Sequence, residues 1–241
     1  MLLNRYNVTI IKKEIGDNME ILDFLLPDID NESSTGELSL VTSDIVDCND
    51  DVAQIKNLDG SYGNLPVTEF YPNKKWEIGK RYILLKKEKY GKITYSARDL
   101  NLIKLLIDGI SPEVRSGDVR IIKIVREVGI RSKVAVASTS LGIDAIESCV
   151  GESAGRVRTL CRLLEGERID FVSYNKDPET FIRNTLGVDI KKITFLENKV
   201  EIEVPSHQYQ AAVGGGGINS LISAKLTDYN LSIIEENLNE K

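Results

Sequence analysis

The second half of the chain contains a repeat, and this feature constrains the fold more than any other. At one constant offset, Val150-Gly151 align with Val213-Gly214, and Arg162-Leu163 align with Lys225-Leu226. In both copies two predicted strands precede a pair of helices that is broken at glycine, and a third strand follows. The predicted strands are 119–125, 133–138 and 168–174 in the first copy, and 190–196, 200–204 and 231–234 in the second. We therefore expect two copies of one α+β unit.

The preceding part of the chain has a different pattern. Five short runs of alternating polar and apolar residues are separated by turn residues such as Asp59-Gly60 and Tyr90-Gly91. The runs are 38–45, 52–55, 65–70, 82–86 and 92–96. Short strands at this density are typical of a small antiparallel barrel. Apolar residues at helical spacing from Leu102 to Leu106 then predict a helix that ends near Gly109.

The composition excludes several classes of protein. No apolar run approaches the roughly 18 residues that a transmembrane helix needs. The cysteines are Cys48, Cys149 and Cys161, an odd number without C-x-x-C spacing, which indicates thiols in a reducing compartment. One histidine and these dispersed cysteines do not make a zinc site. We therefore expect a soluble, cytoplasmic protein with no membrane segment, metal or other cofactor.

Charge is distributed unevenly along the chain. Up to Gly60 the acidic side chains outnumber the basic ones by more than three to one, whereas basic side chains are slightly in excess after it. A short acidic N-terminal segment, 1–35, with a possible amphipathic helix at 17–26, thus precedes a mildly basic body. This asymmetry is consistent with an anionic partner for the body, and equally with ordinary solvated helix faces.

One candidate for chemistry lies in the first repeat. Residues 151–155 match G-x-S-x-G, the motif that carries the nucleophile of many serine hydrolases, and His207 follows downstream. That motif must follow a strand, however, and residues 143–149 predict a helix. No glycine motif that could supply an oxyanion hole precedes Ser153. A serine hydrolase is therefore a remote alternative, and we expect no enzymatic activity and no catalytic residue.

The glycine run of the second repeat predicts a different chemistry. Gly214 to Gly217 match neither a P-loop nor a dinucleotide-binding fingerprint. Residues without Cβ let a backbone come close to a sugar-phosphate chain, and the following helix would present its N-terminus to a phosphate. A G-x-x-G loop between two helices is the device by which KH domains hold single-stranded nucleic acid.

The residues between the predicted barrel and the C-terminus also carry a family resemblance. The run REVGIRSKVAV at 126–136 resembles a signature of the bacterial transcription factor NusA, and 143–151, 156–158, 166–170 and 177–182 continue it in register. Residues 212–217 and 224–227 resemble the second KH module of that family. The barrel region is similar to the family's S1 domain at Leu65-Pro66, at 79–81 and at 96–98.

The resemblance implies an α+β multidomain fold, in which an S1-type OB-fold barrel at 36–98 precedes two tandem type II KH domains at 99–175 and 176–241. It also implies a non-enzymatic factor that binds single-stranded nascent RNA, contacts RNA polymerase and other transcription factors, and modulates elongation, pausing, termination or antitermination. The same modules could serve in RNA decay or ribosome assembly. The expected RNA contacts are Gly151, Arg156, Arg158, Arg131 and Lys133, the glycines Gly214, Gly215, Gly216 and Gly217, and the barrel residues Tyr62, Tyr71, Lys80 and Arg81.

Two departures from the family pattern carry further expectations. The segment 1–35 before the barrel is too short for the family's N-terminal polymerase-binding domain. The first loop has Ala154 where G-x-x-G has its second glycine, and Glu152 adds a negative charge. We therefore expect the second loop to hold more RNA than the first.

Overall fold

The computed structural model describes residues 37–236, and the predicted acidic segment 1–35 with its helix at 17–26 lies outside them. The chain divides into two compact units, and each is treated by itself. The described residues of the first unit are 37–115 and 158–166, and those of the second are 116–157 and 167–236. None of the described helices is both long and apolar enough to cross a membrane.

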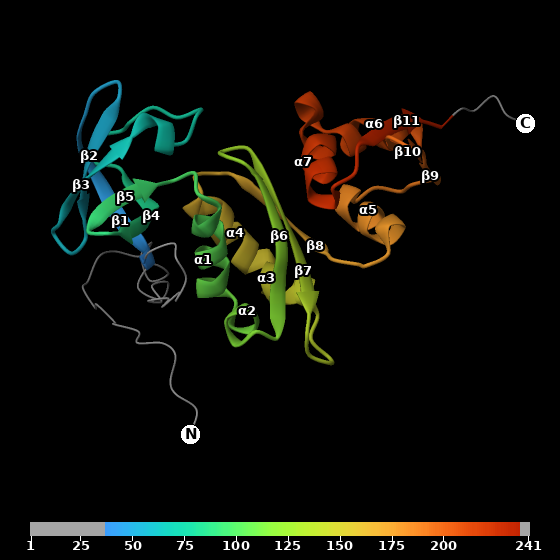
Figure 1. Ribbon diagram of the computed structural model, residues 1–241, viewed down its shortest axis with the longest axis horizontal. Coiled ribbons are helices and arrows are strands. Elements are labelled where there is room, and N and C mark those ends of the chain that lie inside the picture. Colours follow the sequence, from blue (N-terminus) through green and yellow to red (C-terminus); the bar gives the residue numbers. More distant parts are fainter. Residues whose placement is uncertain (1–36, 237–241) are drawn as a thin grey trace, which may run out of the picture. The chain divides into compact units, whose positions relative to one another are not determined.

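The first unit contains a five-stranded antiparallel sheet with the strand order β3-β2-β1-β4-β5 (Figure 1). Its strands are β1 (Glu37–Cys48), β2 (Val52–Asn57), β3 (Tyr62–Pro66), β4 (Arg81–Lys89) and β5 (Lys92–Ser96). The sheet curls until its two edge strands meet, since a Cβ on Gly63 of β3 would lie 2.2 Å from the Tyr95 ring of β5. Tyr95 Oη also accepts a 3.0 Å hydrogen bond from Asn57 Nδ2. The sheet is therefore nearly a closed barrel.

The core of this sheet and its flanking helices follow from the sequence pattern. Ile45, Ile55, Leu65 and Leu84 are fully buried inside the sheet. The predicted strand 65–70 overlaps β3 only at Leu65 and Pro66, because β3 begins at Tyr62 and a 3-10 turn, η2 (Val67–Glu69), follows Pro66. The predicted helix is α1 (Leu100–Ile110), and a short helix, α2 (Pro112–Ser116), comes after it.

The chain from residue 119 to residue 235 confirms the repeated order of elements. In the first repeat the order is β6 (Val119–Glu127), β7 (Arg131–Ser138), α3 (Ala145–Val150), η3 (Glu152–Ala154), α4 (Gly155–Leu163) and β8 (Arg168–Ser173). After α5 (Pro178–Leu186) it returns as β9 (Lys192–Phe195), β10 (Val200–Val204), α6 (Ser206–Val213), η4 (Gly215–Gly217), α7 (Ile218–Thr227) and β11 (Leu231–Glu235).

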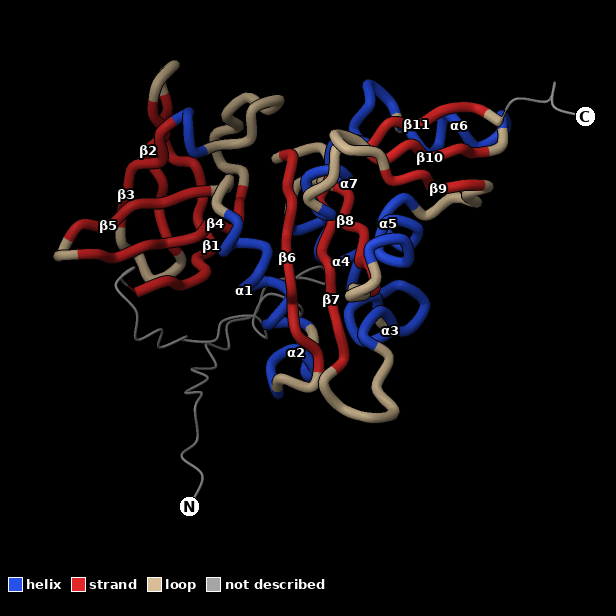
Figure 2. The backbone as a smooth tube through the Cα atoms, turned by 45° about the vertical axis from the view of Figure 1, so that its right-hand side comes forward, coloured by secondary structure: helices blue, strands red, loops and turns tan. Residues whose placement is uncertain are grey.

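The two repeats also share their sheet topology (Figure 2). In each, the first two strands pair antiparallel and the third pairs parallel with the second. Aspartate caps set the helix starts, since Asp144 accepts hydrogen bonds from the N–H groups of Ile146 and Glu147, and Asp177 accepts one from Thr180. Gly187, in a left-handed conformation, ends α5.

Helix α7 of the second repeat packs on the sheet of the first. Its Ile222 and Leu226 share a buried cluster with Val125 of β6 and Ala135 of β7. A separate buried cluster in the second repeat includes Ile202 of β10 and Ala212 of α6. The two repeats therefore share part of their core, which places the glycine loop before α7 near residues of the first repeat.

Candidate nucleic-acid interface

The two glycine loops have closely similar backbone conformations at equivalent positions when the repeats are aligned. Gly151 has φ 75° and ψ 166°, and Gly214 has φ 79° and ψ 162°. This region of conformational space is essentially restricted to glycine. The third loop positions, Ser153 and Gly216, are both left-handed, with φ of 47° and 61°. The first repeat therefore keeps the loop shape although two of its residues have side chains in left-handed conformations.

A side chain from the following helix holds each loop. A Cβ on Gly151 would lie 2.5 Å from Arg156 Cγ, and a Cβ on Gly214 would lie 2.8 Å from Asn219 Cβ. Arg156 Nη1 donates a hydrogen bond to the Ser148 carbonyl. Arg156, which we expected to contact RNA, therefore braces the first loop, whereas Arg158 is exposed on α4.

Asn219 has the corresponding role in the second loop. Its Nδ2 lies 3.2, 3.0 and 3.3 Å from the carbonyl oxygens of Ala211, Ala212 and Leu186. The Asn219 side chain is 1% exposed, and its Oδ1 is buried without a hydrogen-bond partner among the described residues. Asn219 thus ties α7 to the ends of α6 and α5 and fixes where the loop lies.

The second loop is open to an approaching ligand. A Cβ added to Gly215 or Gly216 would meet nothing within 4 Å. The loop borders a cavity of about 520 Å³ that residues of both repeats line, among them Arg131, Arg168, Gly214 and Ile218. The N-terminus of α7 begins at this cavity, and unpaired N–H groups at a helix start favour an anion.

Two arginines of the first repeat lie at the rim of that cavity. Arg131 and Arg168 are opposite one another in the parallel pairing of β7 and β8. Arg131 Nε donates to Asp170 Oδ2 at 2.5 Å. Arg168 is exposed and forms no ion pair with the described residues. Arg168 is not among the RNA contacts expected from the sequence, because only the parallel register of the two strands brings it beside Arg131.

Lys133 is not an RNA contact, which corrects that expectation. Its side chain is 2% exposed, and Nζ donates to the backbone carbonyl of Thr185. Burial lowers the pKa of Lys133 from 10.5 to about 8, while Asp170 acts in the opposite direction. Lys133 therefore joins β7 to the C-terminal end of α5 inside the protein.

The two tyrosines predicted in the barrel have different environments. Tyr62 is 59% exposed on β3, and Lys56 Nζ lies 5.8 Å from the centre of its ring. Tyr71 is 2% exposed and packs edge-on against Phe70 with ring centres 5.4 Å apart. Tyr71 is therefore part of the core and cannot stack on a base, whereas the face of Tyr62 is accessible.

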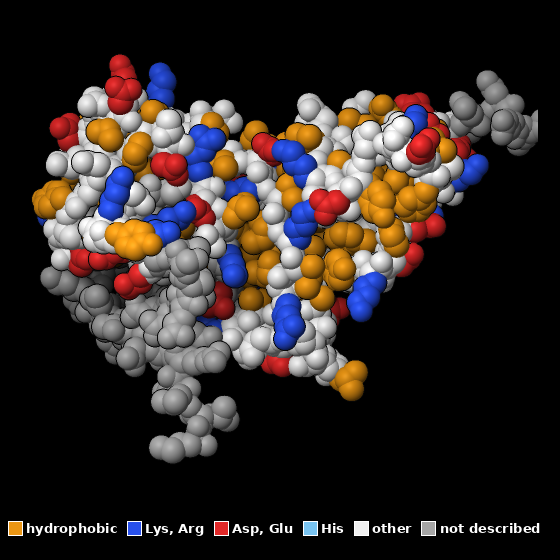
Figure 3. Space-filling model, in the orientation of Figure 1, with side chains coloured by type: hydrophobic (Ala, Val, Ile, Leu, Met, Phe, Trp, Pro, Cys, Tyr) orange, Lys and Arg blue, Asp and Glu red, His pale blue; other side chains and the backbone are white. Residues whose placement is uncertain are grey.

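The two predicted basic residues of the barrel are engaged in ion pairs. Lys80 Nζ lies 2.8 Å from Glu165 and 3.1 Å from Glu77, and these carboxylates raise the pKa of Lys80. Arg81 donates to both carboxylate oxygens of Asp44, at 2.7 and 2.9 Å, and this lowers the pKa of Asp44. Neither Lys80 nor Arg81 is a free cation for a phosphate in this arrangement. On the face drawn in Figure 3, basic side chains are scattered among acidic ones.

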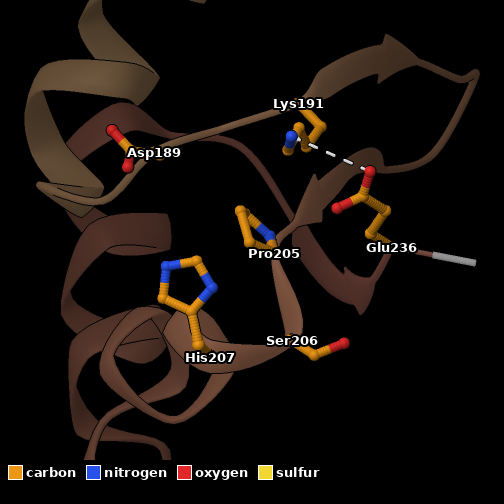
Figure 4. A pocket seen from close by; sticks show the side chains of 6 residues that line it. All are labelled: Asp189, Lys191, Pro205, Ser206, His207 and Glu236. Carbon is orange, nitrogen blue, oxygen red and sulfur yellow. Dashed lines mark ion pairs between the residues drawn. The ribbon is translucent and has the colours of Figure 1, made fainter. Parts of the chain in front are cut away.

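The geometry is wrong for the serine hydrolase alternative. A helix, α3, precedes Ser153, whereas the nucleophile of that class follows a strand. His207 lies on α6 beside a second hollow of about 600 Å³, with Asp189, Lys191, Pro205, Ser206 and Glu236 (Figure 4). Ser153 is not among the residues that line this hollow. Among the described residues, no group of three or more His, Cys, Asp or Glu side chains could hold a metal ion.

Comparison with known proteins places these features in a family. Residues 97–174 match the NusA-like first KH domain. The chain is 33% identical over 182 residues to the transcription termination/antitermination protein NusA of Mycobacterium tuberculosis, covering 72% of this chain and 52% of that protein. It is 30% identical over 220 residues to the protein of that name in Bacillus subtilis, covering 83% of this chain and 59% of the relative.

A third relative, NusA of Thermus thermophilus, is 33% identical over 184 residues, which cover 73% of this chain and 48% of that protein. The chain thus spans about half the length of the relatives that it matches. Among solved structures, the crystal structure of APE1850 aligns with a TM-score of 0.41 and 22% identity, covering 58% of this chain and 99% of that one. Over the region that it shares with these relatives, the chain is NusA-like, and residues 97–174 match the NusA-like first KH domain.

Proposed function

We propose that this protein binds single-stranded RNA and acts as a NusA-type, non-enzymatic transcription factor in the cytoplasm. The observation that carries the proposal is the second glycine loop. Gly215 and Gly216 leave the backbone open at the start of α7, next to a cavity with Arg131 and Arg168 on its rim. This arrangement lets a sugar-phosphate chain approach the helix N-terminus while cations and N–H groups face its phosphates.

The proposed architecture is that of the family. The nearly closed five-stranded sheet would be an S1-type OB-fold barrel at 36–98, followed by two tandem type II KH domains at 99–175 and 176–241. The shared topology of the two three-stranded sheets and the shared conformation of the two loops support the second KH domain. In this assignment Gly151, Gly214 to Gly217, Arg131, Arg158 and Tyr62 contact RNA, and Arg168 joins them.

The proposed partners are the nascent transcript, RNA polymerase and other transcription factors. Through them the protein would modulate elongation, pausing, termination or antitermination. Its relatives in Mycobacterium tuberculosis and Bacillus subtilis are named transcription termination/antitermination proteins. The polymerase contact is tested by immobilising this chain and probing for purified bacterial RNA polymerase. Retention of the polymerase supports the transcriptional role. If no polymerase is retained at micromolar concentrations, a direct contact is contradicted.

RNA binding is tested with a labelled single-stranded RNA by fluorescence anisotropy. Gly215→Asp places a carboxylate at the open loop, and since the φ of Gly215 is not left-handed and its Cβ position is empty, the fold is retained. We expect at least a tenfold loss of affinity. Asn198→Asp, in the exposed turn between β9 and β10, adds the same charge away from the loop and serves as the control. Failure of the unaltered protein to bind, or full binding by Gly215→Asp, would contradict the proposal.

A further inference from the structure

The hairpin between β4 and β5 ends in a turn that departs from the usual residue preferences. Lys89 and Lys92 form its last strand pair, and only Tyr90 and Gly91 connect them. Both connecting residues have positive φ, 52° for Tyr90 and 72° for Gly91. A two-residue hairpin of this kind favours Asn, Asp or Gly at the first position, because a left-handed backbone is unfavourable for bulky side chains.

Packing does not compensate for Tyr90 at this position. Its side chain is 96% exposed, so the ring contributes almost nothing to the core of the sheet. An unfavourable backbone conformation that no packing contact offsets indicates a functional constraint. The ring instead presents an accessible aromatic face at the tip of the hairpin.

The two flanking lysines add a second departure. Lys89 and Lys92 lie directly opposite one another across the strands, and like charges in this position are destabilising. Both are exposed, and neither forms an ion pair with any residue between 37 and 236. Lys89 Nζ lies 5.4 Å from the centre of the Tyr90 ring. The tip therefore combines two cations that have no acidic partner among the described residues with one exposed aromatic ring.

We propose that Tyr90, flanked by Lys89 and Lys92, stacks on an unpaired base of single-stranded RNA while the two ammonium groups face its phosphates. The inference rests on the proposed RNA-binding function and adds a contact that is separate from the glycine loops. An aromatic platform with adjacent cations suits a single strand, whose base faces are accessible, better than a duplex, whose bases are already stacked. The same sheet carries a second exposed pair of this kind, Lys56 over Tyr62.

The test relies on one substitution that should raise the stability of the protein and lower its affinity for RNA. Tyr90→Asn supplies the residue that the turn favours, so we expect Tm to rise by about 2–4 °C. The same substitution removes the stacking ring, and we expect the affinity of the full chain for a labelled single-stranded RNA to fall about 5- to 150-fold. Tyr90→Phe keeps the ring and should bind as the unaltered protein does.

Two controls separate stacking from other effects. Ile78→Asn removes an exposed apolar side chain elsewhere on the same unit, where Ile78 is 67% exposed, and should leave binding unchanged. Inorganic polyphosphate has no bases, so the affinity of Tyr90→Asn for it should equal that of the unaltered protein. An equal loss for polyphosphate and RNA would overturn the stacking role. RNA binding by Tyr90→Asn at the unaltered affinity would refute this inference alone, whereas no binding by the unaltered protein would refute the proposed function as well.

Discussion

Arg156 and Asn219 occupy equivalent positions in the two repeats and brace the two glycine loops in the same way. Each side chain donates a hydrogen bond to a backbone carbonyl of the preceding helix, that of Ser148 in the first repeat and that of Ala211 in the second. Both bonds join the helix after a loop to the last turn of the helix before it. Because these contacts join residues of the flanking helices, the loop residues themselves can differ between the repeats while the backbone conformation stays similar.

The contacts of Arg156 and Asn219 with the loops predict that replacing Gly151 or Gly214 destabilises the protein. Gly151→Ala or Gly214→Ala forces a Cβ into a glycine-only conformation and against Arg156 or Asn219. We expect each change to lower the free energy of unfolding by about 1–3 kcal/mol in urea denaturation. Gly215→Ala is the matched control and should leave stability unchanged or slightly higher, since nothing occupies the position of its Cβ. Equal stability of all three variants would contradict the bracing role.

The buried ion pair between Arg126 and Glu167 predicts that replacing Glu167 strongly destabilises the protein. The side chains of Arg126 and Glu167 are 1% and 0% exposed and meet at 2.9 Å, and Glu167 also accepts hydrogen bonds from Gly129 N and Ser132 Oγ. Glu167→Gln removes the carboxylate charge that faces the buried Arg126 guanidinium. We expect a loss of about 3–5 kcal/mol in chemical denaturation.

The control for this pair is Glu179→Gln, which breaks the exposed pair between Glu179 and Arg183. That change should cost less than about 1 kcal/mol, because water screens the charges of an exposed pair. Similar losses for the two variants would show that the Arg126–Glu167 pair is not specially important to the fold.

The lowered pKa of Lys133 predicts that the free energy of unfolding rises with pH. The pKa of Lys133 is about 8 in the folded protein and near 10.5 when unfolded. Between these values the unfolded chain holds the proton that the folded protein has lost, so the free energy of unfolding increases with pH, by about 3 kcal/mol over the whole interval. Lys133→Met removes this titration. From pH 8 to pH 10 the unaltered protein should therefore gain stability relative to Lys133→Met. A stability difference that stays constant over this range would refute the assignment.

The first loop predicts a gain of affinity on charge reversal. Glu152 is exposed at the loop position that Gly215 occupies in the second repeat. Glu152→Lys replaces a repulsion of phosphate by an attraction, and we expect the affinity for single-stranded RNA to rise about three- to tenfold at low salt. Glu197→Lys, in the exposed turn before β10, makes the same charge change elsewhere. An equal gain from both variants would indicate a non-specific effect of net charge.

Much of the fold was predictable from the sequence, because its signals are local. Apolar residues at periods of 2 and 3.6 placed most strands and helices, and the internal repeat predicted two units with one order of elements. Glycine at positions 151 and 214 marked both loops, since the required backbone conformation excludes other residues. The strand predicted at 65–70 was displaced, since β3 begins at Tyr62 and ends at Pro66, where a 3-10 turn follows.

The candidate site was less predictable, because partners distant in the sequence decide what a side chain can reach. Tyr71 and Lys133 have types that suit RNA contacts, but packing against Phe70 and the end of α5 buries them. Glu165, far along the chain from the barrel, pairs with Lys80, and the parallel register of β7 and β8 alone places Arg168 beside Arg131. The sequence by itself determined the elements and the loops, since backbone preferences act between neighbouring residues. Only the tertiary structure decided which side chains remain exposed, since burial and ion pairing depend on contacts between segments that the chain brings together on folding.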